Sequence, residues 1–317
     1  MMEKPHGSLF RTPEKSSVII DLIKEKKEIK FISSANEFLI NGVCDSRRGG
    51  ENKFSFINKD QYENNHHYKK IKNSILLMDA VPEAHTWVSN QICVLDDPRA
   101  VFIETLNTLI QLEKNASPPQ NDHQNLNISP YADISASAHI EADVHVGEGS
   151  VICAGVILKS GTKIGKNTII RENTVVGSDG ITIYRSQDNR LLKFPHVGGV
   201  VIGDNSEIGA NSVVVKGILE PTWISDHVII GNLCNIGHGV NIGSHSWISV
   251  GSLVGGHSII EAQTTIAMGV RIRDNITIGT QAAIGMGSVV TKNVEPQHSV
   301  FGNPAKRFIG LKTGPER

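Results

Sequence analysis

The stretch Ile236-Gly237-His238-Gly239-Val240-Asn241 is one of many six-residue units in the second half of this 317-residue chain. A branched aliphatic residue stands at every sixth position of one unbroken series: Ile224, Ile230, Ile236, Ile242, Ile248, Val254, Ile260, Ile266, Ile272, Ile278, Ile284 and Val290. An α-helix cannot hold a period of six in phase for more than about two turns. The pattern is typical of a hexapeptide-repeat parallel β-helix, in which three units form one triangular coil.

The repeat also predicts where its side chains point. We expect each aliphatic residue to face the interior of the prism, stacked on a residue about eighteen positions later. We expect the Gly or Asn that follows it to relieve the corner backbone with a positive φ. Known hexapeptide helices coil left-handed, against the usual crossover rule, and we take the handedness from them. The predicted fold class is mainly β: a left-handed parallel β-helix with a small N-terminal α/β domain.

The extent of the repeat divides the chain. Residues 1–112 lack the period and are predicted to form an α/β domain, possibly nucleotide-binding. This domain has a helix over residues 17–24, strands over 38–40 and 75–78, and a helix that begins at Asp97-Pro98, a good N-cap and first-turn pair. The polar, proline-bearing residues 113–127 are predicted to be a linker, followed by the β-helix over 128–300 and a tail over 301–317.

The repeat is interrupted twice. It stops after Val176, where residues 178–197 form an inserted loop, and it slips by four residues before locking again at Ile224. A solenoid tolerates insertions at its corners, and such insertions usually build the binding face. The aromatic and cationic residues of this loop suit a phosphorylated sugar, although a loop without function remains an alternative.

Composition excludes several classes of protein. The formal net charge of −1 suggests neither nucleic acid nor an anionic membrane surface as a partner. No apolar run is long enough to span a membrane, and residues 1–10 lack a signal-peptide core, so we expect a cytoplasmic protein. The four cysteines are scattered without metal-ligand spacing. We therefore expect reduced core cysteines and no metal.

One histidine is a candidate for catalysis. His238 stands at an outward position among hexads of Ile, Gly, Asn and Ser, so the register excludes a core role. A histidine suits a general base that removes a proton from an attacking amine or hydroxyl. His245 and His257 are also outward, and spacing alone does not rank the three. Gly239 leaves room for a pantetheine arm.

Several longer motifs carry a family resemblance. They are Phe54-Ser-Phe-Ile-Asn-Lys-Asp-Gln-Tyr62, Gly177-Ser-Asp-Gly180, Lys193-Phe-Pro-His-Val-Gly-Gly-Val-Val-Ile-Gly-Asp204, Glu207-Ile-Gly-Ala210 and Asn232-Leu-Cys-Asn-Ile-Gly-His238. Together they resemble the UDP-3-O-acyl-glucosamine N-acyltransferases of lipid A synthesis, over nearly the whole chain. The resemblance implies a homotrimer with active sites between neighbouring prisms, where the sugar amine attacks an acyl thioester.

The resemblance also assigns residues. It makes His238 catalytic and implies a set of substrate-binding residues: Phe56, Asn58, Tyr62, Asp179, Lys193, His196 and Asn232. The chain departs from the family at Gly231, where an acidic residue is expected, and at Asn275, which aligns with a second histidine. Its ending, Phe301-Gly-Asn-Pro-Ala-Lys-Arg307, instead resembles acetyl-CoA-dependent hexapeptide transferases. We expect four residues to contact the acyl donor: Gly239, His257, Lys306 and Arg307.

These considerations predict an acyltransferase of EC class 2.3.1. Our main prediction is an N-acyltransferase that uses acetyl- or short acyl-CoA on a nucleotide-linked amino sugar for a surface glycan such as O-antigen. One alternative is the lipid A enzyme itself, with acyl carrier protein as donor, and another is a sugar O-acetyltransferase. A non-enzymatic or zinc-binding β-helix is a further alternative. Zinc would need three converging histidines, and the position one coil after His238 is Gly256.

Overall fold

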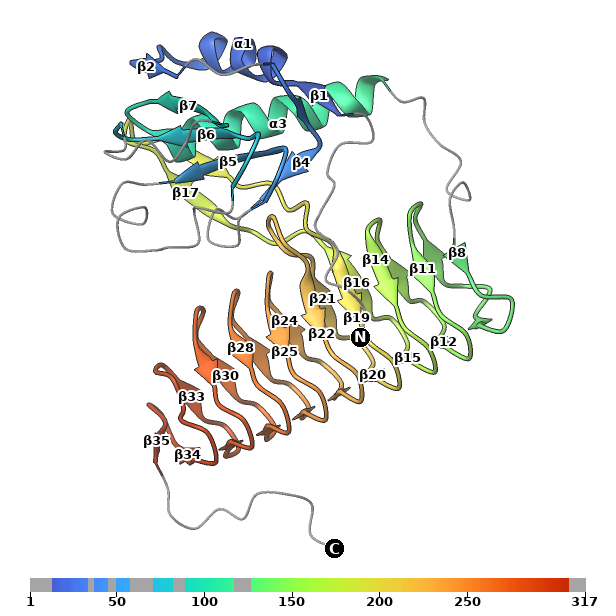
Figure 1. The fold of residues 1–317 in the computed structure, drawn as a ribbon. Coiled ribbons are helices and arrows are strands. Elements are labelled where there is room, and N and C mark those ends of the chain that lie inside the picture. The colour runs from blue at the N-terminus through green and yellow to red at the C-terminus, as the bar shows by residue number, and fades with distance from the viewer. Residues whose placement is uncertain are drawn as a thin grey trace, which may run out of the picture. The chain divides into compact units, whose positions relative to one another are not determined.

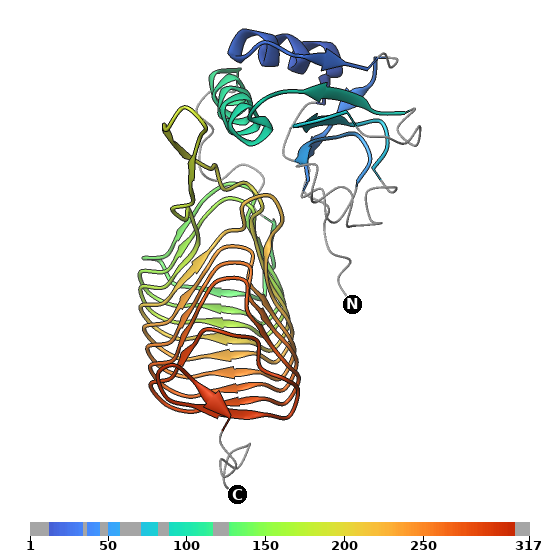
Figure 2. The same ribbon diagram turned by 90° about the vertical axis from the view of Figure 1, so that its left-hand side faces the viewer.

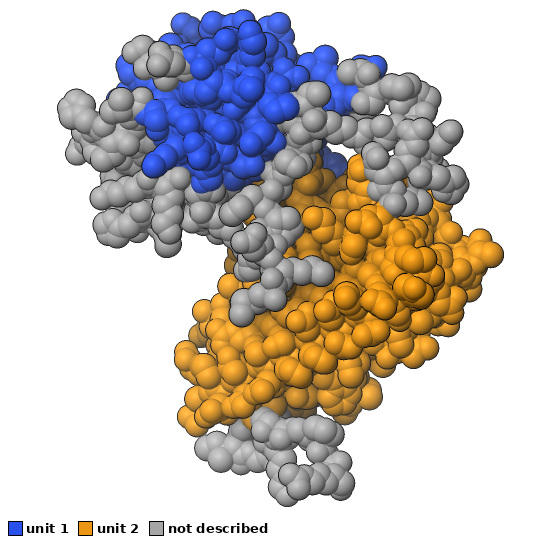
Figure 3. All heavy atoms as spheres, turned by 45° about the vertical axis from the view of Figure 1, so that its right-hand side comes forward, with its two compact units in different colours: residues 1–119, 181–195 blue, residues 120–180, 196–317 orange. Residues whose placement is uncertain are grey.

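The chain folds into two compact units in a computed structural model, which describes residues 13–33, 37–44, 50–57, 71–81, 89–116 and 127–307. Unit 1 comprises residues 1–119 together with 181–195, and unit 2 comprises residues 120–180 and 196–317 (Figure 3). The inserted segment is therefore divided. Its central hairpin packs with unit 1, whereas its two ends stay with unit 2.

Unit 2 is a prism built from three parallel sheets (Figures 1 and 2). The first sheet contains β10 (His139–Ile140), β13 (Ile157–Leu158), β16 (Val175–Ser178), β21 (Val213–Val215), β24 (Asn235–Ile236), β27 (Leu253–Val254), β30 (Arg271–Ile272) and β33 (Val289–Val290). The second contains β8 (Asn127–Ile128), β11 (His145–Val146), β14 (Thr162–Ile164), β19 (Val200–Ile202), β22 (Thr222–Ile224), β25 (Asn241–Ile242), β28 (Ile259–Ile260) and β31 (Thr277–Ile278). The third contains β9 (Asp133–Ile134), β12 (Val151–Ile152), β15 (Ile169–Ile170), β20 (Glu207–Ile208), β23 (Ile229–Ile230), β26 (Trp247–Ile248), β29 (Thr265–Ile266), β32 (Ala283–Ile284), β34 (Ser299–Phe301) and β35 (Lys306–Arg307).

The register confirms the predicted left-handed parallel β-helix. Ile236 of β24 pairs with Val254 of β27, eighteen positions later, and Val254 pairs with Ile272 of β30. These stacked aliphatic side chains are almost fully buried in one continuous core. Each such side chain stabilises the fold by roughly 1.5–3 kcal/mol, so the column that defines the repeat also holds the prism together.

The corner geometry corrects one expectation. Positive φ falls on the third residue after the inward aliphatic, such as Gly239 at 64° and His257 at 57°, and not on the residue directly after it. The glycine directly after the aliphatic has a different role. A Cβ at Gly237 would lie 2.8 Å from the carbonyl oxygen of Val254. Glycine is needed there because the next coil passes too close for a side chain.

Both insertions fall on the same corner, between the first and second sheets. Paired residues of successive coils, such as Asn235 and Leu253, are typically 18 positions apart, but this separation rises to 38 across the first insertion and to 22 across the second. The second value confirms the predicted slip of four residues. We call the turns between these two sheets the insertion corner.

Unit 1 contains a five-stranded sheet in the order β2 (Phe31–Ile32), β7 (Gln91–Val94), β6 (Ile75–Met78), β5 (Lys53–Ile57), β4 (Gly42–Val43). It also contains the pair β1 (Glu14–Lys15) and β3 (Leu39–Ile40), the hairpin β17 (Ile183–Arg185) and β18 (Leu191–Lys193), and helices α1 (Ser16–Lys26) and α3 (Pro98–Ala116). Neither of these described helices is long and apolar enough to cross a membrane.

The expected helices are confirmed. In α1, Ile19, Ile20 and Ile23 are buried on one face. The backbone N–H of Ala100 donates to Oδ1 of Asp97 at 3.0 Å, which is the expected N-cap of α3. Helix α3 continues to Ala116, past the domain boundary that we placed at residue 112, because residues 111–114 are all good helix formers.

Candidate active site at the insertion corner

Three histidines of unit 2 meet at the insertion corner. The ring centroids of His238 and His257 are 4.8 Å apart, and those of His238 and His196 are 5.4 Å apart. Both ring pairs are edge-to-face, with interplanar angles of 75° and 72°. The sequence did not rank His257 above His245. The structure brings His257 to His238 and places His245 at another corner, stacked on His227.

Glycines make room for these imidazoles. A Cβ at Gly256 would lie 2.4 Å from Cε1 and 2.5 Å from Nε2 of His238. A Cβ at Gly239 would lie 2.7 Å from Nδ1 of His257. The two rings thus lean toward each other's coils, and each one occupies the space above a glycine. Any side chain at Gly256 would displace the His238 ring.

Burial and charge set the protonation state of His238. Burial lowers the pKa of His238 below its ordinary 6.5, while the negative charge of Asp274 acts to raise it, and burial prevails. Its Nδ1 is buried and has no hydrogen-bond partner among the described residues. His238 is therefore a neutral imidazole at pH 7, the state that a general base requires.

A hydrogen-bond chain fixes the turn that carries His238. The backbone N–H of Gly239 donates to Oγ1 of Thr222 at 2.9 Å, and the Thr222 hydroxyl donates to the carbonyl oxygen of Val215 at 2.6 Å. Thr222 is fully buried. Because it joins the coil of His238 to the coil before it, Thr222 limits how far the turn that carries His238 can move.

An ion pair lies on the coil before His238. Nζ of Lys216 is 2.7 Å from Oδ1 of Asp179, and the backbone N–H of Lys216 donates to the carbonyl oxygen of Ser178. Val214 pairs with Ile236, so Lys216 and His238 occupy equivalent positions on adjacent coils. The structure thus brings Asp179, a predicted substrate-binding residue, to the same corner.

Other predicted site residues lie elsewhere. Asn232 is at the corner between the third and first sheets, where its Oδ1 accepts a hydrogen bond from the N–H of Ala210 at 2.9 Å. Lys306 and Arg307 form β35, which folds back antiparallel on β34 at the C-terminal end of the prism. Neither group lies at the insertion corner.

The predicted nucleotide residues belong to unit 1. Phe56 is half-buried in an aromatic cluster, with its ring centroid 4.9 Å from that of Phe102 and 6.2 Å from that of Phe194. Lys193 is exposed on β18. Asn58 and Tyr62 lie outside the described residues. Phe56 thus has packing partners of its own, and any nucleobase would contact only its exposed part.

The described residues hold no group of three His, Cys, Asp or Glu side chains arranged for a metal ion. The insertion corner instead offers a neutral base, an ion pair and close-packed glycines. Such a site can accept a proton from a nucleophile.

Sequence reasoning missed four contributors to this site: Lys216, Thr222, Gly256 and Asp274. Gly256 and Asp274 follow His238 at intervals of eighteen, so the repeat itself could have identified them. No comparable signal marks Thr222, since its role depends on how the chain closes the four-residue slip.

Fold and site together define a hexapeptide-repeat β-helix protein with a histidine-centred corner. Residues 143–178 match the bacterial transferase hexapeptide family (six repeats). The chain is also 33% identical over 119 residues to UDP-3-O-acylglucosamine N-acyltransferase of Delftia acidovorans, covering 38% of this chain and 35% of that protein. The enzyme of the same name from Shewanella denitrificans is 46% identical over 81 residues, which cover 26% of this chain and 24% of its own length.

These matches confirm the resemblance that the sequence motifs suggested, over 26% to 38% of this chain rather than over nearly the whole of it. The matched segments span about a third or less of the relatives' own length. Among solved structures, UDP-N-acetylglucosamine acyltransferase of Francisella novicida overlaps with 24% identity and a TM-score of 0.49, covering 59% of this chain and 69% of that one.

Proposed function

We propose that this protein is an N-acyltransferase that acts on the amine of a UDP-linked amino sugar. The observation that carries the proposal is the setting of His238, a half-buried imidazole with a lowered pKa at the corner where both insertions occur. The name of the sequence relatives supports the acceptor, since it specifies a UDP-linked acylglucosamine. This acceptor corresponds to our alternative function rather than to the O-antigen reading.

The proposed reaction is an acyl transfer from a thioester to an amine. The amine nitrogen attacks the thioester carbonyl carbon, and its proton passes to the neutral His238. The C–N bond forms, the C–S bond breaks, and the sulfur leaves as a thiol after taking up a proton. General-base help of this kind contributes about 10²–10⁴-fold to the rate.

We propose acyl carrier protein as the first donor to test. The name of the sequence relatives favours our alternative function, the lipid A enzyme. In the family that the sequence resembles, that enzyme uses acyl carrier protein as its donor. The acyl-CoA prediction relied on Lys306 and Arg307, and their position on β35 places them away from the insertion corner. Acyl-CoA therefore remains the competing donor.

We further propose self-association into a trimer through the prism. A set of large apolar side chains is exposed along the third sheet, the corner beside it and strand β27 of the first sheet: Ile229, Leu233, Trp247, Val250, Leu253, Met268 and Met286. Val250, Met268 and Met286 stand at equivalent turn positions of successive coils, so they form a continuous strip. Apolar patches of this kind on soluble proteins mark interaction sites. Light scattering would test the trimer, and we expect Met268→Asp to dissociate it.

A transfer assay tests the proposed activity. The purified chain is incubated with UDP-, GDP- and dTDP-linked amino sugars and with matched acyl carrier protein or acyl-CoA donors, and thiol release is recorded. We expect thiol release only with a UDP-linked amino sugar, and we expect it to be faster with the carrier protein. Absence of release with every UDP-linked acceptor would reject the proposal.

A further inference from the structure

Arg99, in the first turn of α3, is surrounded by aromatic rings in unit 1. Its guanidinium carbon lies 4.8 Å from the ring centroid of Tyr184, 5.8 Å from that of Phe194 and 5.9 Å from that of Phe56. The rings come from the inserted hairpin and its flank and from β5. The site they form is therefore contained within one unit.

This cation has no protein counterion in the described part of the chain. No carboxylate lies within ion-pair distance of Arg99, and its Nε is buried without a hydrogen-bond partner among these residues. Burial lowers the pKa of Arg99, although Tyr184 and Asp97 act against this. Partial removal of a charge from water is unfavourable unless another group compensates. Cation–π contacts offset only part of this cost.

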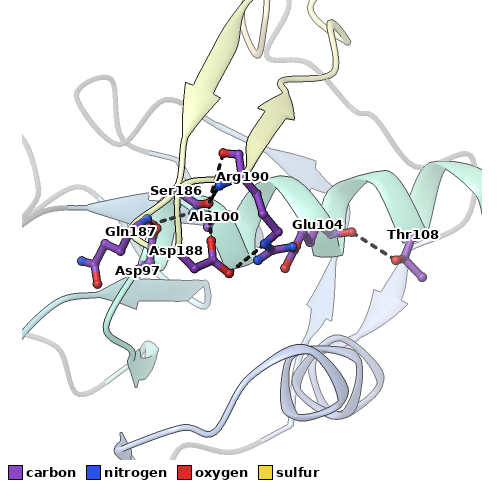
Figure 4. Close-up of polar contacts among 8 residues, drawn as sticks. All are labelled: Asp97, Ala100, Glu104, Thr108, Ser186, Gln187, Asp188 and Arg190. Carbon is purple, nitrogen blue, oxygen red and sulfur yellow. Dashed lines mark hydrogen bonds and ion pairs between the residues drawn. The ribbon is translucent and has the colours of Figure 1, made fainter.

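The nearby carboxylate of Asp97 is already occupied by neutral donors. Its Oδ1 accepts a hydrogen bond from the Tyr184 hydroxyl at 2.9 Å. Oδ1 also accepts one from the N–H of Ala100, and Oδ2 accepts one from the N–H of Gln187 at 2.9 Å (Figure 4). Burial is the main cause, and the hydrogen bond to Asp97 the second, that raises the pKa of Tyr184 to about 12, so the hydroxyl keeps its proton. Asp97 thus anchors the hairpin and does not pair with Arg99.

The other arginine that joins the hairpin to α3 provides a contrast. Nε of Arg190 is 2.7 Å from Oδ2 of Asp188, and its Nη1 is 2.5 Å from Oε1 of Glu104 (Figure 4). Arg190 is therefore fully compensated by carboxylates. Arg190 already links the hairpin to α3, and that link does not require a second arginine without a carboxylate partner. The position of Arg99 therefore needs another explanation.

We propose that Arg99 is an anion-binding residue that holds a phosphoryl group of a substrate, with Phe56 and Tyr184 flanking the ligand. A planar guanidinium binds phosphate oxygens through paired N–H donors, and the aromatic faces suit a nucleobase beside it. The inference extends the proposed function, since both a UDP-linked sugar and a phosphopantetheine donor carry phosphoryl groups.

Binding measurements on the full chain test this site without turnover. We would titrate UDP, uridine, inorganic pyrophosphate and coenzyme A into the wild-type protein, Arg99→Met and the control Arg190→Met. Methionine keeps the apolar stem and removes the charge. We expect Arg99→Met to raise the Kd for UDP and pyrophosphate roughly tenfold to hundredfold, the usual effect of losing a charge-assisted hydrogen bond. The Kd for uridine should change little.

The control variant distinguishes a ligand-binding role of Arg99 from a structural role in holding the hairpin on α3. Arg190→Met should leave the Kd for UDP within about twofold, because a partly exposed ion pair contributes little to a ligand that it does not touch. If both variants lose UDP affinity equally, Arg99 has only a structural role in holding the hairpin, and the proposal is rejected. Weakened coenzyme A binding with unchanged UDP binding would assign the phosphoryl group to the donor.

Two further outcomes are decisive. An unchanged Kd for every phosphorylated probe in folded Arg99→Met would overturn the site. If that variant does not fold, Arg99→Lys takes its place. Lysine keeps the charge without the planar fork, so we expect the Kd for UDP to rise about threefold to tenfold, and an unchanged Kd would count against the proposal. UDP binding through Arg99 in a protein without transfer activity would instead reject only the proposed function.

Discussion

Replacement of Gly256 by alanine would test the geometry of the candidate base most directly. The new Cβ would lie 2.4 Å from Cε1 of His238, whereas the optimal separation of two carbon atoms is about 3.5 Å. The imidazole must therefore retreat by about 1 Å. A misplacement of this size can cost about 10²-fold in rate, which corresponds to about 2.7 kcal/mol of transition-state stabilisation.

The expected signature is a loss of turnover without a matching loss of stability. The displaced group is a side chain that can rotate, and Gly256 is not among the positions of positive φ, so the melting temperature of Gly256→Ala should fall only slightly. The His238 ring should also become more exposed, and its pKa, followed by NMR of the ring proton, should rise. Wild-type turnover together with an unshifted imidazole titration would refute this reasoning.

Gly269 supplies the matched control. It has a φ of 69°, and a Cβ there would meet no heavy atom within 4 Å. Alanine at Gly269 should cost about 1–2 kcal/mol in the free energy of unfolding through backbone strain alone. Turnover should remain normal because Gly269 lies at a different corner. The two variants should therefore show opposite effects on rate and stability.

Three further predictions concern the same corner. His238→Ala should lower turnover about 10²–10⁴-fold with little loss of thermal stability, and near-normal turnover would exclude it as the base. The rate should rise with pH through a midpoint below 6.5, because His238 acts as a base only when neutral and burial lowers its pKa. Asp274→Asn removes a negative charge that raises this pKa, so the midpoint should move to lower pH. A move to higher pH would contradict the assignment. Thr222→Val leaves the Gly239 N–H without its acceptor and the Val215 carbonyl without its donor, so chemical denaturation should show a loss of about 1–3 kcal/mol, whereas unchanged stability would argue against the hydrogen-bond chain.

The period of six was sufficient to predict the fold of unit 2. Residues such as Ile236 and Val254 repeat at a spacing that only stacked coils can satisfy, and the structure pairs them as expected. The same logic predicted the four-residue slip. The period did not predict which corner residue has a positive φ. Glycine is favoured both where the next coil approaches closely and where the backbone is left-handed, so the sequence alone does not distinguish the two positions.

The composition of the site was less accessible from the sequence. An outward position and a motif were enough to select His238, and the interval of eighteen marks Gly256 and Asp274. His196 and Thr222 could not be placed in the same way, because each follows an insertion that breaks the period. The packing of the inserted hairpin with unit 1 depends on long-range contacts such as Tyr184 with Asp97, which no local pattern encodes.

Mass analysis of the acyl-transfer product tests the central claim most directly. The full chain, a UDP-linked amino sugar and an acyl thioester donor are incubated, and the sugar product is fragmented to locate the new acyl group. We expect an amide on the sugar nitrogen, formed by the wild-type protein and greatly reduced with His238→Ala. An ester on a hydroxyl, or an amide formed equally well by His238→Ala, would contradict the account.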